Sequence, residues 1–435
     1  MKYQEALAWL EELSRFGIQL GLRRMERLAQ LLGNPERRYR IVHVTGTNGK
    51  GSVSAMMAAA LSRCGIATGL YTSPHLVSYT ERMGINGRAI SEADFARTLT
   101  RVRQAVETMT AAGEESPTQF EVLTAQAFLW FAEEKTEYAV VEVGLGGLLD
   151  STNIIFPDLT IITNVTLEHA DRCGGTLEGV ARHKAGIIKE GVPVVTAARG
   201  MPLNIIRQTA AQKHAPLYVA GEDFTSRFAG IAEGKQRISF AWGKAGYDST
   251  APYEVSLLGD HQRENAAVAI QAFRVLQTQD GRFTEAALRE ALRETVWPGR
   301  FEAMDIGRVR IRIDGAHNPA GIAALRTALD DYFPEDRRVF LLGILRDKDI
   351  DTMLRTLLRL EDRVMLTRPD SERAADPREL ATKATAQEVR VKANPEKALA
   401  EALTMVSDDS LLVVTGSLYL VGRIRALLLQ MRGGK

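Results

Sequence analysis

The residues with the clearest chemical potential lie in a short glycine-rich segment, residues 46–52 (GTNGKGS). A β-branched run at 40–45 precedes the segment and predicts a buried strand, and a helical stretch at 53–63 follows it. Backbone N–H groups of such a loop can cradle phosphates, with the Lys50 ammonium as a point charge. The strict P-loop pattern fails, because Val44 stands where the first Gly belongs and an extra Gly follows Lys50. We therefore expect a variant phosphate loop; the alternative is a connection whose glycines only permit close packing of strand and helix.

A carboxylate and an imidazole follow two other predicted strands. Glu142 lies at the end of the apolar run 138–143, and His169 lies beyond the run 159–165. Ligands of open parallel sheets bind at the carboxyl ends of the strands, so Glu142 is well placed to hold Mg²⁺. The alternative for Glu142 is a satisfied polar residue at a strand end. A lone His is more often structural, and Mg²⁺ prefers oxygen.

A third group of candidates lies in the C-terminal third of the chain. Asp314 and His317 follow another predicted strand, where the alternative is a capping turn of the Asx type. Arg300 could pair with phosphate or with a surface acid. Lys184 lies in a helix-like run at 176–189, and composition alone favours a solvated face for it.

Alternating strands and helices must position these residues. Short apolar runs bounded by Gly, Pro or Asp are separated by helix-length segments, a pattern typical of a mostly parallel α/β sheet with both faces covered. Pro298 and Gly299 mark a boundary, after which five more candidate strands begin. We expect a larger α/β domain with a P-loop-type sheet at 1–296 and a smaller open α/β domain at 297–435.

Composition excludes several classes of protein. The chain has 435 residues, with 55 Lys+Arg against 54 Asp+Glu, so no global field would hold nucleic acid or an anionic membrane. No apolar run reaches the roughly 18 to 20 residues of a membrane span. Two cysteines are too few for a disulfide framework, which favours a reducing compartment, the cytoplasm.

Seven motifs in family order resemble the folylpolyglutamate synthase/dihydrofolate synthase family of the Mur ligase superfamily. They are GTNGKGS at 46, TSPHL at 72, VEVGLGG at 141, LEH at 167, HKAGIIK at 183, PGRFE at 298 and DGAHNP at 314. The resemblance covers nearly the whole chain and implies an ATP-binding domain with the folate pocket at 1–296 and a Rossmann-like glutamate-ligase domain at 297–435. It implies an ATP-dependent amide ligase that adds L-glutamate to a folate or to dihydropteroate. The substrate carboxylate would first take the γ-phosphoryl group of ATP, and the glutamate amine would then attack the acyl phosphate.

The resemblance also implies roles for individual residues. The ATP contacts would be Thr47, Asn48, Gly49, Lys50, Gly51, Ser52, Asn265, Arg300 and Asp314. The ligands of Mg²⁺, expected as two ions, would be Ser73, Glu142, His169 and a carbamylated Lys184. The pterin pocket would be lined by Gly17, Ile18, Gln19, Phe120, Glu121, Leu149, Asp150 and Ser151. Lys50, Lys184, Arg300 and His317 would be catalytic, and a monomer is expected.

Three positions depart from the family pattern. Leu148 replaces an Arg, His183 replaces a Glu before the Lys, and Ala170 replaces a Thr. These changes concern the preferred folate form rather than the ligase chemistry. The rival hypotheses are a Mur-type ligase acting on another carboxylate, and a P-loop kinase or ATP-binding module without ligation.

Overall fold

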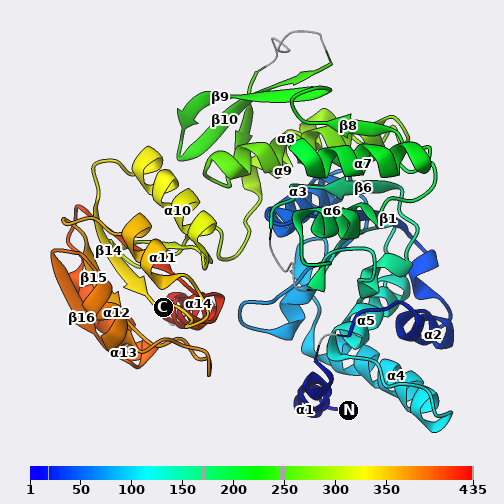
Figure 1. Cartoon of the computed structure of the whole chain (residues 1–435), viewed down its shortest axis with the longest axis horizontal. Helices are drawn as coiled ribbons and strands as arrows, with labels where there is room; N and C mark the ends of the chain where they lie inside the picture. The colour runs from blue at the N-terminus through cyan, green and yellow to red at the C-terminus, as the bar shows by residue number, and fades with distance from the viewer. Residues whose placement is uncertain (18, 168–171, 244–250, 434–435) are drawn as a thin grey trace. The chain divides into compact units, whose positions relative to one another are not determined.

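The chain divides into two compact units, each with its own sheet and core (Figure 1). The computed structural model describes the whole chain except residues 18, 168–171, 244–250 and 434–435. Unit 1 comprises residues 1–231, 237–256 and 262–295, and unit 2 comprises 232–236, 257–261 and 296–435. Assignment of ATP binding and glutamate ligation to separate domains stays a prediction.

Unit 1 is built on an eight-stranded sheet in the order β4-β3-β2-β5-β1-β6-β7-β8. Its strands are β1 (Arg40–Thr45), β2 (Thr68–Tyr71), β3 (Met83–Ile85), β4 (Arg88–Ala89), β5 (Tyr138–Glu142), β6 (Leu159–Ile162), β7 (Val194–Thr196) and β8 (Leu217–Val219). All neighbours from β2 to β8 pair in parallel, whereas β3 is antiparallel to β2 and β4. Val44 is in register with Glu142, and Thr45 with Ile162. The carboxyl ends of β5, β1 and β6 therefore meet at one edge.

The helices of unit 1 include those that cover both faces of this sheet, so its central strands are buried along most of their length. The helices are α1 (Tyr3–Leu13), α2 (Arg23–Leu31), α3 (Lys50–Arg63), α4 (Glu92–Ala111), α5 (Gln119–Glu133), α6 (Leu177–Ala185), α7 (Gly200–Gln212), α8 (Asp260–Gln277) and α9 (Glu285–Glu294). Short 3-10 turns are η1 (Ser14–Phe16), η2 (Pro35–Arg37), η3 (Tyr79–Arg82) and η4 (Ser151–Ile154). Figure 1 shows α6 and α7 beside β6. A separate sheet has the order β11 (Tyr253–Val255), β10 (Lys235–Trp242) and β9 (Phe224–Ala232).

Unit 2 has a six-stranded sheet in the order β12-β13-β17-β14-β15-β16. Its strands are β12 (Glu302–Ala303), β13 (Arg310–Ile313), β14 (Arg337–Leu342), β15 (Arg363–Leu366), β16 (Glu388–Val391) and β17 (Ser410–Thr415). Its helices are α10 (Pro319–Tyr332), α11 (Ile350–Leu357), α12 (Pro377–Lys383), α13 (Pro395–Met405) and α14 (Leu418–Gly433). Five strands are parallel and β12 is antiparallel. The predicted α/β class, with a mostly parallel sheet in each unit, is confirmed.

Two helix boundaries differ from the sequence prediction. α3 begins at Lys50 rather than at 53, so the lysine itself belongs to the first turn. α6 ends at Ala185, because Gly186 caps it, whereas the pattern suggested a helix to 189. None of the helices in the described part of the chain is long and apolar enough to cross a membrane.

Candidate active site

The glycine-rich loop between β1 and α3 packs closely against the end of β6 and against α8. A Cβ at Gly46, whose φ is +152°, would lie 1.8 Å from Thr163 Oγ1. A Cβ at Gly49, whose φ is +85°, would lie 2.2 Å from Asn265 Oδ1. Both glycines are required for the close approach as well as for the backbone conformation. The loop is therefore held between the end of β6 and helix α8.

Hydrogen bonds from the β6 end fix the loop backbone. Thr47 N donates to Asn164 O at 2.9 Å, and Asn48 N donates to Asn164 Oδ1 at 2.9 Å. Thr163 Oγ1 donates to Asn48 O at 2.6 Å. Thr163 and Asn164 were not identified from the sequence. The signal was present, because they are polar residues near the end of the predicted strand 159–165, as Glu142 is near the end of 138–143.

Lys50 and Ser52 form hydrogen bonds with different partners. Lys50 Nζ donates to Gly46 O at 3.0 Å and to Thr47 O at 3.1 Å. The ammonium thus lies over the carbonyls of its own loop. Ser52 Oγ accepts from Gln262 Nε2 at 3.1 Å, and Gln262 Oε1 accepts from Asn265 Nδ2 at 3.0 Å. The structure therefore brings the predicted ATP contact Asn265 to the loop, more than 200 residues away in sequence.

Glu142 and Ser73 lie together at the same sheet edge. The Glu142 side chain ends β5, is only 4% exposed, and accepts from Ser73 N at 3.2 Å through Oε2. Burial of a carboxylate is costly unless hydrogen bonds or a cation stabilise it. Both side chains offer oxygen donors, which suit Mg²⁺. The other predicted ligand, His169, lies outside the described residues. Within the described ranges, no three Asp, Glu, His or Cys residues cluster as a metal site.

Lys184 is buried, so the solvated position favoured by composition is wrong. Lys184 is 6% exposed and lies near the end of α6. The loop 144–150, which comes after β5, packs on this end of α6. A Cβ at Gly147 would lie 2.6 Å from His183 O and 3.3 Å from Lys184 Cα. Leu148 N also donates to His183 O at 2.8 Å. Partial burial, and secondarily the Lys184 charge, lower the pKa of His183.

Asp150 shapes the loop between β5 and η4. Its carboxylate accepts from Leu145 N at 2.8 Å and from Thr152 Oγ1 at 2.6 Å. Burial raises the pKa of Asp150, and these hydrogen bonds oppose the shift. Because the Thr152 hydroxyl donates to Asp150, it must accept from His43 Nε2, 2.9 Å away. Burial, with a contribution from the Lys189 charge, lowers the pKa of His43 to about 3, so the imidazole is neutral.

The predicted pterin segments meet around the N-terminus of α5. Gly21 N donates to Leu149 O at 3.4 Å, and Arg24 donates to Gln19 O at 3.0 Å. The Phe120 ring faces the loop after β5, since a Cβ at Gly144 would lie 2.4 Å from its Cζ. Of the remaining candidates, Gly17 begins this N-terminal segment, Ser151 opens η4, and Ile18 lies outside the described residues.

The Glu121 carboxylate forms hydrogen bonds within the protein, at the start of α5. Its carboxylate accepts from Thr118 N at 2.7 Å in a capping box and from Arg24 Nε at 3.1 Å. A ligand would have to compete with a buried helix cap and an ion pair. We therefore assign Glu121 a positioning role at the start of α5.

The SPHL segment between β2 and β3 contains a second imidazole, His75, which is half-buried. Arg82 Nε donates to His75 Nδ1 at 2.9 Å, and the His75 and Tyr79 rings lie 4.3 Å apart. Burial and, to a smaller extent, the Arg82 charge lower the pKa of His75 to about 4. The neutral imidazole acts as an acceptor that fixes the guanidinium.

In unit 2, Asp314, Arg300 and His317 lie around one turn. Asp314 accepts from Phe301 N and Ala316 N, both at 2.9 Å, which is the Asx-type turn that the sequence left open. Burial raises the pKa of Asp314, and the Arg300 charge opposes this. His317 Nδ1 donates to Gly315 O at 2.8 Å, which places its lone pair on Nε2. Contact of these residues with ATP stays a prediction.

Comparison with known proteins gives matches along most of the chain. Residues 44–273 match the Mur ligase middle domain, and residues 299–418 match the Mur ligase glutamate ligase domain. A dihydrofolate synthase/folylpolyglutamate synthase of Bacillus subtilis is 34% identical over 97% of this chain and 98% of its own. Folylpolyglutamate synthase of Mycobacterium tuberculosis, solved with ADP, has a TM-score of 0.87 and 32% identity, covering 98% of this chain and 99% of its own. E. coli FolC, solved with DHPP and ADP, has a TM-score of 0.83 and 27% identity, with 98% of each chain covered.

Proposed function

Because the chain belongs to the Mur ligase family, in its folylpolyglutamate and dihydrofolate synthase branch, we propose that it joins L-glutamate to a folate or to dihydropteroate. It is an ATP-dependent acid–amino-acid ligase. The observation that carries the assignment is the phosphate loop itself. Relatives of full-length similarity have been solved with ADP, and in this chain the loop is locked by β6 and α8 beside the buried Glu142.

The reaction needs an activated carboxylate, because a carboxylate oxygen is a poor leaving group. The substrate carboxylate attacks the γ-phosphorus of ATP, the bond to the bridging oxygen breaks, and ADP leaves. The glutamate amine then attacks the acyl carbon, and phosphate carries away the bonding electron pair. The loop N–H groups hold the phosphates, and Lys50 turns from its own carbonyls towards them. We assign His317 Nε2 to accepting the proton that the amine loses.

Mg²⁺ fits the oxygen donors of Ser73 and Glu142, and we propose that these residues hold it. The bound ion would offset the charge of the ATP phosphates. Two ions, with His169 among the ligands, remain part of this proposal. A monomer in a reducing compartment is also proposed; the small number of cysteines, two in 435 residues, supports the latter.

Parallel assays with two acceptors test the function. We expect phosphate release only when ATP, L-glutamate and an acceptor, either dihydropteroate or tetrahydrofolate, are all present, with a product one glutamyl residue heavier by mass spectrometry. ATP hydrolysis or phosphoryl transfer independent of glutamate would favour the kinase or ATP-binding module. Activity with neither acceptor, but with another carboxylic acid, would favour a different Mur-type ligase.

Carbamylation of Lys184 is a further part of the proposal. A buried ammonium would repel a cation, whereas a carbamate formed from the neutral amine and CO₂, with loss of a proton, offers oxygens to Mg²⁺. Lys184→Ala should be nearly inactive and should recover part of its activity with added acetate, which can fill the vacated space. Lys184→Arg should not be rescued, because it keeps the charge and the volume.

A spectroscopic measurement separates this role from a structural one. Protein equilibrated with ¹³C-labelled CO₂ should show a carbamate carbon signal that is absent from Lys184→Ala. Full activity of the Ala variant, or no difference in that signal between the two proteins, would refute carbamylation.

A further inference from the structure

A basic cavity lies within unit 2, away from the turn that carries Asp314 and His317. It has a volume of about 650 Å³. Its walls come from the loops after β14 and β15, the start of α12, and the end of β16. These three strands are parallel, so the cavity lies at their carboxyl ends, where open α/β sheets bind ligands.

Backbone contacts hold the walls of this cavity in place. Ala375 N donates to Ile344 O at 3.0 Å, which ties the loop after β15 to the loop after β14. Arg368 N donates to Ala393 O at 3.2 Å, which ties the end of β15 to the end of β16. The cavity is therefore a preformed feature of the fold, and a ligand would not have to order its walls.

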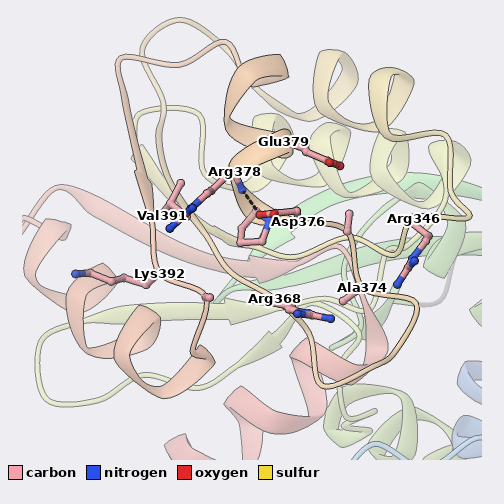
Figure 2. A pocket seen from close by; sticks show the side chains of 11 residues that line it. Arg346, Arg368, Ala374, Asp376, Arg378, Glu379, Val391 and Lys392 are labelled. Carbon is pink, nitrogen blue, oxygen red and sulfur yellow. Dashed lines mark hydrogen bonds between the residues drawn. The ribbon is translucent and has the colours of Figure 1, made fainter.

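Three guanidinium groups reach the cavity from different segments. Figure 2 shows Arg346 after β14 and Arg368 after β15 on one side of Asp376, and Arg378 in the first turn of α12 with its side chain extending towards Val391. All three residues are exposed. In the part of the chain that the structure describes, none of the three forms an ion pair with a carboxylate; Arg346 instead donates to the backbone carbonyl of Glu372.

The two carboxylates that line the cavity offset only part of the charge of the three arginines. They belong to Asp376 and Glu379, and Asp376 also accepts from Arg378 N, a backbone group, at 2.9 Å. Lys392 adds a fourth basic side chain; it pairs with Glu401 at 3.1 Å and extends away from Arg346 and Arg368 in Figure 2.

Several other arginines of the same unit are paired with carboxylates, whereas Arg355 and Arg359 donate only to backbone carbonyls and a hydroxyl. Arg363 binds Glu388 at 2.8 Å, and Arg425 binds Glu302 at 2.9 Å. Cationic side chains that line the same cavity repel each other, and binding of an anion reduces this repulsion. A guanidinium group also matches carboxylate and phosphate oxygens in a bidentate geometry.

We propose that this cavity binds a small organic or inorganic polyanion, with at least two carboxylate or phosphate groups. The volume exceeds that needed for a single oxyanion and falls in the range of ligand pockets. Two sources supply this chemistry: a chain of linked glutamates, which rests on the proposed function, and a di- or triphosphate, which does not.

Binding to the full chain tests the site without any ligation step. The protein would carry Lys50→Ala, so that the phosphate loop contributes little. Isothermal titration would use a γ-linked glutamate trimer in one arm and inorganic pyrophosphate in the other. We expect at least one of them to bind, and Arg368→Gln with Arg378→Gln to weaken its Kd by at least tenfold.

A second pair of arginines provides the control. Arg355→Gln with Arg359→Gln removes the same charge from exposed positions of unit 2 that do not line the cavity, and should change the Kd by less than twofold. Thermal unfolding would check folding, and the single variants Arg368→Gln and Arg378→Gln carry the test if the double variant does not fold.

Each outcome has a defined meaning. Binding of the trimer alone identifies a carboxylate ligand, and binding of pyrophosphate alone identifies a phosphate ligand. Absence of binding by both anions, or equal weakening in the cavity pair and the control pair, overturns the proposal. Because ligation is not measured, failure of the proposed function would leave this result intact.

Discussion

Lys50→Ala should lower the rate of ligation at saturating ATP by about 100- to 1,000-fold, the loss typical of removing one charge-stabilising group from a reacting centre. The lysine opens α3 within the phosphate loop, and its Nζ lies 3.0 Å from Gly46 O and 3.1 Å from Thr47 O. From there a change of side-chain rotamer is enough to move the charge towards a phosphate. Without it, only backbone N–H groups of the loop would face the transferring group.

A binding measurement separates catalysis from damage to the loop. The Ala variant also loses two hydrogen bonds to the loop, so its thermal unfolding and its affinity for ADP should be measured beside the rate. Lys213→Ala, an exposed lysine after α7, is the matched control and should behave as wild type. Near-normal turnover of Lys50→Ala would contradict the assignment of this segment as a phosphate loop.

Glu142→Gln should lower activity by about 100-fold or more and shift the Mg²⁺ dependence to higher concentration. The amide keeps the volume of the side chain and an oxygen that can accept from Ser73 N, so the fold should persist. It loses the negative charge that favours a divalent cation. Activity across a Mg²⁺ titration, with the melting temperature as a second readout, tests the prediction.

The opposite end of the same strand supplies the control for this experiment. Glu137 directly precedes β5 and pairs with Arg282 at 2.8 Å on an exposed surface. An exposed ion pair contributes about 1 kcal/mol or less to stability, so Glu137→Gln should leave activity and Mg²⁺ dependence unchanged. If Glu142→Gln and Glu137→Gln have the same kinetics, Glu142 is a structural residue.

The central elements could be read from local patterns. The run 40–45 coincides with β1, and the run 138–143 extends one residue beyond β5. Mostly apolar strands separated by helix-length segments bury their side chains only in a sheet that helices cover on both faces, so the fold class could be predicted as well. The position of Glu142 at a carboxyl end followed from the same argument, because parallel strands place those ends on one edge.

Contacts between distant segments could not be predicted in this way. No pattern near Asn265 indicates that its amide lies against Gly49, and none near Thr163 indicates that its hydroxyl occupies the space beside Gly46. These contacts depend on how α8 and β6 pack beside β1. Glu121 shows the converse: its motif suggested a ligand contact, whereas packing commits its carboxylate to Thr118 and Arg24.

The sequence by itself thus determined the two sheets, the phosphate loop and the acid at the edge of the first sheet, because periodicity and turn residues act over a few neighbouring positions. Only the tertiary structure decided that Lys184 is buried and that Arg346, Arg368 and Arg378 share one cavity. The physical reason is that burial and unpaired charge depend on which atoms surround a side chain. In a folded chain most of those atoms belong to residues far away in sequence.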